Sequence, residues 1–256
     1  MNETLNVLNN RISLRRYKDK PISEDHLEQI LYSTMRAPTA GNMMLYTVLV
    51  IKDQEKIEKL SKSCDNQPFI AKAPLVLIFL ADMQRWTDYL QHCDIKKFCK
   101  EKEMEYHGPT NGDLFLSISD ALIAAQNAVI AAESLNIGSC YIGDIMENYE
   151  IHKEMLNLPD KVFPIGMLTL GYYPDGMDKT TKPRFGKEYI VFEEEYKRLS
   201  GEDFDNMFQH ISKNFNPNNA FDAKNIGQIA YSRKFGSDFA KEMERSVNIM
   251  IKHWNK

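Results

Sequence analysis

The sequence predicts a globular chain that mixes α-helices and β-strands around one or two apolar cores. Of its 256 residues, 43% are hydrophobic and 27% are charged, a balance typical of folded domains. Residues 47–51 and 73–81 are short apolar runs of strand length, whereas residues 113–136 repeat their apolar side chains at helical spacing. A chain of this length can bury a sizeable core as one large domain or as two small ones.

Charge, hydropathy and cysteine usage argue against nucleic-acid-binding, membrane, exported and metal-binding proteins. The formal net charge of −4 and the pI of 5.9 do not favour a broad basic surface for nucleic acid. The mean hydropathy is −0.45, and the longest apolar run is about half the length that a membrane-spanning helix needs. The first residues, MNETLNVLNNR, lack the apolar segment of an export signal. The four cysteines show no CxxC spacing, and the six histidines show no ligand spacing. We therefore expect a cytoplasmic protein that binds neither nucleic acid nor a membrane and holds no metal.

The N-terminal quarter of the chain is expected to form three helices and a strand. Residues 3–10 form a short helix, and Ser23 caps the next helix, which Pro38 ends. The apolar face of this second helix contains Leu27, Ile30, Leu31, Thr34 and Met35. The β-branched run 47–51 is a strand, and Asp53 caps the third helix.

The middle of the chain is expected to hold three strands and the longest helix. The continuous apolar run 73–81 is typical of a strand that is buried on both faces. Residues 139–142 and 163–171 are two further strands. Residues 113–136 form the long helix, with Gly138 as its stop signal.

The long helix carries both large apolar side chains and alanines. Its expected inward face is Leu114, Ile118, Leu122, Ala125, Val129 and Ala132. Alanines leave little bulk on its flanks, so another helix can approach it closely. It is therefore either a central core helix or a helix at a subunit interface. The preceding residues 82–112 have a looser pattern and form a helix, a lid or both.

The C-terminal part of the chain is more polar. Residues 188–192 are expected to form a short strand, and residues 193–212 a helix. A turn-rich linker at 214–219 leads to a terminal helix over residues 226–254. Because this part has few apolar residues, we expect residues 193–256 to pack on the main body or on a partner.

Two basic clusters are candidate anion sites. The first is the segment RISLRR, in which Arg11, Ser13 and Arg15 converge on one anion if the chain is extended. The second is the KPR segment, Lys182 to Arg184, in a loop after a predicted strand. Arginine forms paired, charge-assisted hydrogen bonds with phosphate. Taken alone, each cluster is weak evidence, because basic residues beside a helix end are usually solvated.

Two loops are suited to lie against a ligand. The loop APTAGN, residues 37–42, offers small side chains, a hydroxyl, an amide and backbone N–H groups, which suits a flat polar ligand. The segment YIGD, residues 141–144, ends a predicted strand, and Gly143 can present its N–H group. Both segments also match ordinary turn chemistry. The sequence has no GxSxG, HExxH, GxxxxGK[ST] or GxGxxG motif, so a nucleophile elbow, a zinc protease, a P-loop and a Rossmann site are not indicated.

The two basic clusters and the two loops, taken in their order along the chain, resemble the nitroreductase family of FMN enzymes. The resemblance is closest to its branch of NADPH-dependent oxygen-insensitive nitroreductases and flavin reductases. The resemblance covers most of the chain. It rests on RISLRRYKDKPIS, APTAGN, Gln67 before APLVLIFLAD, AQNAVIAAESLNIGSCYIGDI, LTLGYYP, KPR and the tail RKFGSDFAKEMERSV. It implies an α+β fold, a three-layer sandwich with a mostly antiparallel central sheet flanked by helices, in an intertwined homodimer. Residues 1–192 would be the FMN-binding domain, and residues 193–256 a C-terminal helical extension.

The resemblance also implies roles for individual residues. The FMN phosphate would be held by Arg11, Ser13, Lys182 and Arg184. Arg15 would lie near N1 and O2 of the flavin, and Gln67 would hydrogen-bond the pyrimidine edge. The backbone of Gly143 and Asp144 would face N5. The loop around Thr39 would line the ring and would be supplied in part by the partner chain. The other implied cofactor positions are Ile12, Pro38, Thr39, Ala40, Asn42, Tyr141 and Ile142. Arg233 is a candidate for the phosphate of the nicotinamide nucleotide, or else a solvated charge.

The implied activity is that of an NAD(P)H oxidoreductase. NADPH or NADH would pass a hydride to N5 of FMN, and a nitroaromatic, quinone or flavin acceptor would then take two electrons in a ping-pong reaction. The sequence departs from the family pattern at Ile12, where a second arginine is frequent, and at Met44, where a glutamine is common. These departures leave a non-catalytic flavin-binding dimer, for storage or sensing, as the alternative.

Overall fold

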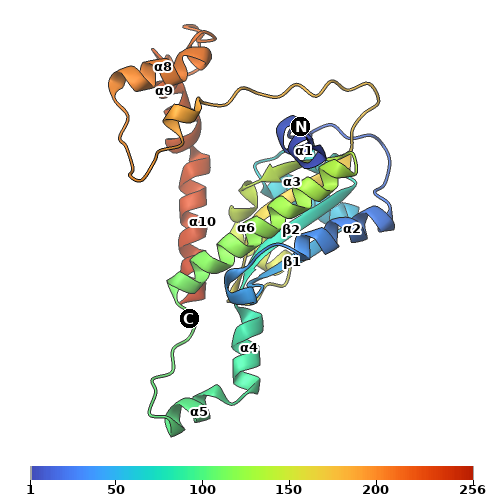
Figure 1. The fold of residues 1–256 in the computed structure, drawn as a ribbon, viewed down its shortest axis with the longest axis vertical. Coiled ribbons are helices and arrows are strands. Elements are labelled where there is room, and N and C mark those ends of the chain that lie inside the picture. The colour runs from blue at the N-terminus through green and yellow to red at the C-terminus, as the bar shows by residue number, and fades with distance from the viewer. Residues whose placement is uncertain (1, 256) are drawn as a thin grey trace. The chain divides into compact units, whose positions relative to one another are not determined.

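The chain folds as a mixture of helices and strands, and a computed structural model describes residues 2–255 (Figure 1). It divides into two compact units, a first unit of Met1–Lys179 with Glu242–Lys256 and a second unit of Thr180–Lys241. The predicted boundary at residue 193 falls inside the second unit. The division into a flavin-binding domain and a helical extension stays a prediction.

The first unit is built on a four-stranded sheet with the order β1-β2-β4-β3, in which every neighbouring pair is antiparallel. The strands are β1 (Tyr46–Ile51), β2 (Leu75–Asp82), β3 (Ile137–Ile142) and β4 (Val162–Tyr172). All residues of β2 are buried, as its continuous apolar run predicts. The expected α+β class and the antiparallel sheet are therefore confirmed.

Helices cover both faces of the sheet, which produces three layers. Figure 1 shows α6 (Asn111–Ser134) running across the sheet beside α2 (Glu24–Met35). Leu77 of β2 packs with α2 and α6, whereas the next side chain, Ile78, packs with α3 (Gln54–Ser63). Because successive side chains of a strand point to opposite faces, the two apolar clusters lie on opposite sides of the sheet.

Local capping signals set the starts of three helices. The Ser23 side chain accepts a hydrogen bond from the His26 amide at the start of α2, and Asp53 accepts one from the Lys56 amide at the start of α3. Both predicted caps are confirmed. The capping box of Thr110 and Asp113 starts α6 at Asn111, two residues before the predicted start. The first helix, α1 (Glu3–Asn10), has its predicted bounds.

The inward face of α6 matches the prediction in part, because the predicted residues Leu114, Ala125, Val129 and Ala132 are buried and Leu122 is not. Its fully buried positions include Ala121, Ala124, Ala125, Ala128 and Ala132. In contrast, Leu122 is 40% exposed and Phe115 is 71% exposed. Small side chains let the helix lie close to the sheet, so they supply the inner face in place of Leu122. Of the helices within residues 2–255, α6 alone is long and apolar enough to cross a bilayer, yet its packing on the sheet makes it a core helix.

Gly138 is not the stop signal of α6, contrary to the prediction. The helix ends at Ser134, and Asn136, with a φ of 58°, makes the left-handed turn. Gly138 lies within β3, where an added Cβ would stand 2.6 Å from Cδ2 of Leu14 and 2.8 Å from Cζ of Tyr173. Close packing, and not a turn, therefore requires this glycine.

The loosely patterned residues 82–112 contain two helices. They are α4 (Gln84–His92) and α5 (Ile95–Glu101). After β3 a 3₁₀ turn, η3 (Asp144–Met146), leads to α7 (Tyr149–Met155). The prediction of a helix in residues 82–112 is therefore confirmed, whereas a lid role stays a prediction.

The second unit is helical, and its elements depart from the predicted ones. Residues 188–192 are not a strand, because within the described part of the chain no strand pairs with them and a 3₁₀ turn covers Lys187–Tyr189. The helix predicted over 193–212 is shorter, as α8 (Gly201–Ser212). The predicted terminal helix is interrupted: it comprises α9 (Ile226–Ala230), a π-helical turn (Tyr231–Phe235) and α10 (Asp238–Trp254). Gly236, a poor helix former, marks the interruption.

The last part of α10 belongs to the first unit and completes its core. Met250 and Trp254 are buried there, and the Trp254 ring lies 5.5 Å from the Phe163 ring. The Trp254 indole N–H donates a hydrogen bond to the backbone oxygen of Thr110 at 2.8 Å. This residue therefore links the end of α10 to the start of α6.

Candidate functional site

The first basic segment is an extended chain that lies along β3. The backbone is extended at Arg11, and the Leu14 amide donates a hydrogen bond to the Ser139 oxygen at 2.9 Å. Ser13 forms a parallel bridge with Ser139. Leu14 is fully buried, whereas Ser13 and Arg15 are exposed. Because side chains alternate along an extended chain, Arg11, Ser13 and Arg15 share one side.

These side chains gather around Cys140 of β3. Burial raises the pKa of the Cys140 thiol, and the nearby Arg15 and Arg11 guanidiniums oppose that rise. The Ser13 side chain opposes the same rise, so it also lies near the thiol. The segment therefore presents two cations and a hydroxyl within a small area at the edge strand of the sheet.

The charges of this segment are not neutralised by carboxylates of the described residues. Within residues 2–255 the arginine ion pairs are formed by Arg85 and Arg245, and neither Arg11 nor Arg15 takes part in one. A phosphate dianion needs several charge-assisted donors. The donor set therefore fits the phosphate group of FMN.

Gln67 lies in a turn that neighbours the basic segment. Its backbone amide donates to the Ser61 oxygen at 2.9 Å, and its side-chain amide donates to the Cys64 oxygen at 3.1 Å. Two residues later, the Phe69 ring centre lies 5.6 Å from the Arg15 guanidinium. The structure therefore brings residues 67–69 close to Arg15, with the Gln67 side-chain oxygen left as an acceptor.

The segment at the end of β3 is open to solvent. Tyr141 and Gly143 are exposed and Ile142 is buried. Tyr141 is 37% exposed, and its partial burial raises its pKa to about 12, a rise that the nearby Arg11 opposes. A Cβ added at Gly143 would meet no heavy atom within 4 Å. This space, beside the start of the 3₁₀ turn at Asp144, suits a flat ligand that lies against the backbone.

The loop 37–42 is held by a buried carboxylate that sequence reasoning missed. Asp120 of α6 accepts hydrogen bonds from the amides of Ala40 at 2.9 Å and Leu45 at 3.1 Å. The Thr39 hydroxyl accepts one from the Met44 amide at 3.3 Å. The loop leaves Pro38, Gly41 and Asn42 exposed. A charged residue within an apolar helix was the sequence signal for this contact.

The loop 37–42 is distant from the basic segment within one copy of the chain. Asp120 holds the loop, whereas Glu133, thirteen positions later on α6, accepts a hydrogen bond from Tyr173, whose ring lies with Leu14 over Gly138. Thirteen helical residues span about 20 Å. The structure therefore brings together the segments 11–15, 67–69 and 140–144, and leaves the loop apart from them.

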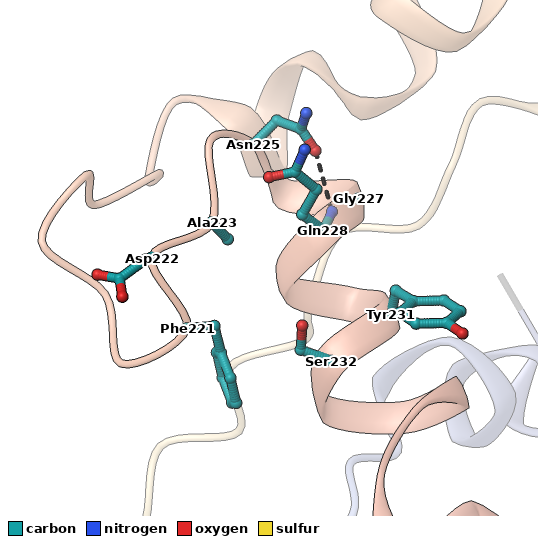
Figure 2. Close-up of a pocket in the computed structure, with 8 residues that line it drawn as sticks. All are labelled: Phe221, Asp222, Ala223, Asn225, Gly227, Gln228, Tyr231 and Ser232. Atoms are coloured by element: carbon teal, nitrogen blue, oxygen red, sulfur yellow. Dashed lines mark hydrogen bonds between the residues drawn. The ribbon is translucent and has the colours of Figure 1, made fainter.

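The remaining predicted residues, Lys182, Arg184 and Arg233, lie in the second unit and are exposed. Arg233 lies in the π-helical turn, next to a cavity of about 470 Å³ that Figure 2 shows. The cavity is lined by Phe221, Asp222, Ala223, Asn225, Gly227, Gln228, Tyr231 and Ser232. Arg233 is not one of its lining residues, and the roles of all three cations stay predictions.

A second buried carboxylate lies just after the 3₁₀ turn. Glu147 is 5% exposed, and its Oε2 has no hydrogen-bond partner among the described residues. Burial and neighbouring carboxylates raise the pKa of Glu147 to about 7. Those neighbours are Asp144, Asp65 and Glu242. Within residues 2–255, no three histidine, cysteine, aspartate or glutamate side chains gather as a metal site would require.

The fold and the segments on β3 define an α+β oxidoreductase scaffold, and the family description "Nitroreductase family" matches residues 8–172. The chain therefore belongs to the nitroreductase family. It is 35% identical over 198 residues to an FMN reductase [NAD(P)H] of Bacillus subtilis (strain 168), which covers 77% of this chain and 75% of that protein. It is also 30% identical over 206 residues to an FMN reductase (NADPH) of the same organism, over 80% and 78% of the two chains.

Solved structures show the same fold. NfrA2 of B. megaterium superposes with a TM-score of 0.76 at 26% identity, over 96% of this chain and 98% of that chain. Nitroreductase A of Vibrio parahaemolyticus RIMD 2210633 superposes with a TM-score of 0.79 at 25% identity, over 98% of both chains. The resemblance inferred from the motifs is thus confirmed, and the chain is an oxidoreductase of the nitroreductase type.

Proposed function

We propose that the chain is an FMN-dependent NAD(P)H oxidoreductase that reduces nitro compounds, quinones or free flavin. The observation that carries the proposal is the cluster of Arg11, Ser13 and Arg15, which is extended along β3 and has no carboxylate partner within the described residues. The names of the two Bacillus subtilis relatives, FMN reductases that use NAD(P)H or NADPH, support the same activity.

The proposed roles of the residues follow from their chemistry. Arg11 and Ser13 bind the FMN phosphate, and Lys182 and Arg184 complete its donor set. Arg15 places a fixed positive charge near the N1 and O2 edge of the ring, which stabilises negative charge there. Bound FMN supplies the hydride chemistry between the nicotinamide nucleotide and the acceptor.

Other residues of the chain orient the ring and bound nucleotide. Gln67 offers its side-chain oxygen to the pyrimidine edge, and the open backbone at Gly143 and Asp144 lies against the ring near N5. Arg233 is our candidate for the phosphate of NADPH. Because FMN supplies the hydride chemistry, the residues of the chain bind the cofactor and the nucleotide, orient them and stabilise charge.

We also propose that two copies form an intertwined homodimer. On α6, exposed apolar side chains form a face that a second copy would cover; they are Phe115, Leu116, Leu122 and Ile123. Ile190 and Val191 are exposed in a segment of strand-type composition that lacks a strand partner within the described residues. The separation of about 20 Å along α6 between the loop 37–42 and the basic segment supports a loop supplied by the other copy.

A cytoplasmic location completes the proposal. The four cysteines, at positions 64, 93, 99 and 140, are free thiols. Reducing compartments keep thiols in this state.

The test is flavin binding followed by anaerobic reduction. The purified protein, supplied with FMN, should be yellow and should be bleached by NADPH or NADH. Arg11→Ala and Arg184→Ala should each weaken FMN binding by about 1–3 kcal/mol. Arg16→Ala is the matched control, because this exposed arginine follows Arg15 on the other side of the extended segment.

Three outcomes would each contradict a part of the proposal. Parental FMN affinity in both Arg11→Ala and Arg184→Ala would show that the phosphate binds elsewhere. Flavin that binds but is reduced by neither nucleotide would favour the non-catalytic dimer. Sedimentation of the parent as a monomer at micromolar concentration would exclude the homodimer.

A further inference from the structure

A buried carboxylate at the end of α6 ties three segments of the first unit together. The Glu133 side chain is 5% exposed. It accepts a hydrogen bond from the Tyr173 hydroxyl at 2.8 Å and pairs with the Lys179 ammonium at 2.6 Å. The same ammonium lies 3.8 Å from the centre of the Tyr173 ring. A buried carboxylate needs such partners, so these contacts are mutually dependent.

Tyr173 connects this carboxylate to the first basic segment. The Ile12 backbone and the Arg11 charge both oppose the rise in the pKa of Tyr173 that burial and Glu133 cause, so residues 11 and 12 lie near the Tyr173 hydroxyl. The Tyr173 ring and Leu14 pack together over Gly138. Tyr173 is therefore wedged between Glu133 and residues 11–14.

Lys179 connects the same carboxylate to the second basic segment. Lys182 follows Lys179 by three residues. Three residues of extended chain span about 11 Å at most. The contact between Lys179 and Glu133 therefore anchors the start of the second basic segment. It limits how far from Glu133 Lys182 can lie, whatever path the chain takes after Lys179.

We infer that Glu133 is a positioning residue for the FMN phosphate, an inference that rests on the proposed function. It holds the origins of both basic segments at one place without being a phosphate ligand itself. A site that is held before the ligand binds loses less conformational freedom on binding. Glu133 therefore sets the affinity for the phosphate group, whereas the affinity for the ring depends on other residues.

The experiment compares FMN with riboflavin, which has the same ring and no phosphate. In Glu133→Gln, FMN affinity measured by fluorescence titration should fall roughly tenfold to a hundredfold, the effect of losing one charged hydrogen bond. Riboflavin affinity should stay at the parental value. Glu150→Gln is the matched control, because it removes the exposed ion pair with Arg245 elsewhere in the first unit.

Three more variants keep the test decisive if Glu133→Gln fails to fold. Tyr173→Phe retains the ring over Gly138 and removes the hydroxyl that donates to Glu133, so it should also lose FMN selectively. Lys179→Arg should retain FMN affinity, whereas Lys179→Met should lose it. In the apo-protein of Tyr173→Phe, the Leu14 amide should exchange its hydrogen faster than in the parent.

The outcomes separate this inference from the function on which it rests. If the parent binds FMN more tightly than riboflavin, and Glu133→Gln and Tyr173→Phe keep that ratio, the positioning role of Glu133 is overturned while the function stands. An equal loss of FMN and riboflavin affinity would also overturn it. A parent that binds neither flavin would contradict the proposed function itself.

Discussion

Replacing Gly138 with alanine tests whether close packing holds the basic segment on β3. The added Cβ would stand 2.6 Å from Cδ2 and 2.8 Å from Cβ of Leu14, and 2.8 Å from Cζ of Tyr173. Non-bonded carbon atoms pack at about 3.5–4.0 Å, so each contact would be roughly 1 Å too short. Leu14 is fully buried, and its Cβ moves only with the backbone. Relief therefore requires residues 11–16 to shift away from β3.

The expected cost follows from this overpacking. Inserting a methyl group into a filled core costs about 1–3 kcal/mol, and we expect about 2 kcal/mol for Gly138→Ala. With a urea m-value of about 3 kcal/mol per M, the unfolding midpoint of the apo-protein should fall by about 0.7 M. FMN affinity should fall as well, because the displaced segment carries Arg11 and Arg15.

Gly143→Ala is the matched control for stability. Its Cβ would meet no heavy atom within 4 Å, so the apo-protein should keep its unfolding free energy within about 0.5 kcal/mol. FMN affinity should nevertheless fall, because the methyl group would occupy the space assigned to the ring. A parental urea midpoint for Gly138→Ala would refute the packing explanation, and parental FMN affinity for Gly143→Ala would refute the placement of the ring.

Three further substitutions test contacts of the first unit. Asp120→Asn should cost about 1–3 kcal/mol, because one of the two loop amides loses its acceptor; an unchanged urea midpoint would contradict this. Glu147→Gln should remove a pH dependence of the unfolding free energy that the parent shows. The pKa of Glu147 is raised from 4.5 to about 7, so its effect on stability is absent below pH 4.5 and becomes a growing penalty until the pH passes about 7. Urea midpoints of parent and variant that decline equally from pH 5 to pH 8 would speak against it. Trp254→Ala should cost about 3–5 kcal/mol in thermal or urea unfolding, because the indole is fully buried; a loss below about 1 kcal/mol would mean that the end of α10 does not close the core.

Elements with local signals were predictable from the sequence. Ser23 and Asp53 cap helices because their side chains reach amides only three residues away. The run 73–81 was identified as a strand because its apolar side chains are continuous, and β2 is buried on both faces. Each signal depends on residues within a few positions of one another, so no knowledge of distant parts was needed.

Features that depend on distant contacts were not predictable. Gly138 has the sequence context of a helix stop, but its role comes from Leu14, which is more than a hundred positions earlier. The inner face of α6 depends on how close the helix lies to the sheet, which favours alanine over Leu122. Residues 188–192 have strand-type composition, yet a strand needs a neighbour that the sequence alone does not supply.

The candidate site divides in the same way. The alternation of Arg11, Ser13 and Arg15 placed three donors on one side of an extended chain, and the structure shows that chain along β3. In contrast, the supporting carboxylates Asp120 and Glu133 were missed. Each is an acidic residue in an otherwise apolar helix, and its partners come from loops that are far away in the sequence.

The return of α10 to the first unit has a consequence for synthesis on the ribosome. Trp254 and Met250 fill the end of a core whose other walls are built from residues before position 180. The whole of 180–241 must therefore be translated before that core can close. Until then Phe163 of β4 and Tyr149 of α7 are exposed to solvent, so this is the stage at which a chaperone would protect the growing polypeptide from aggregation.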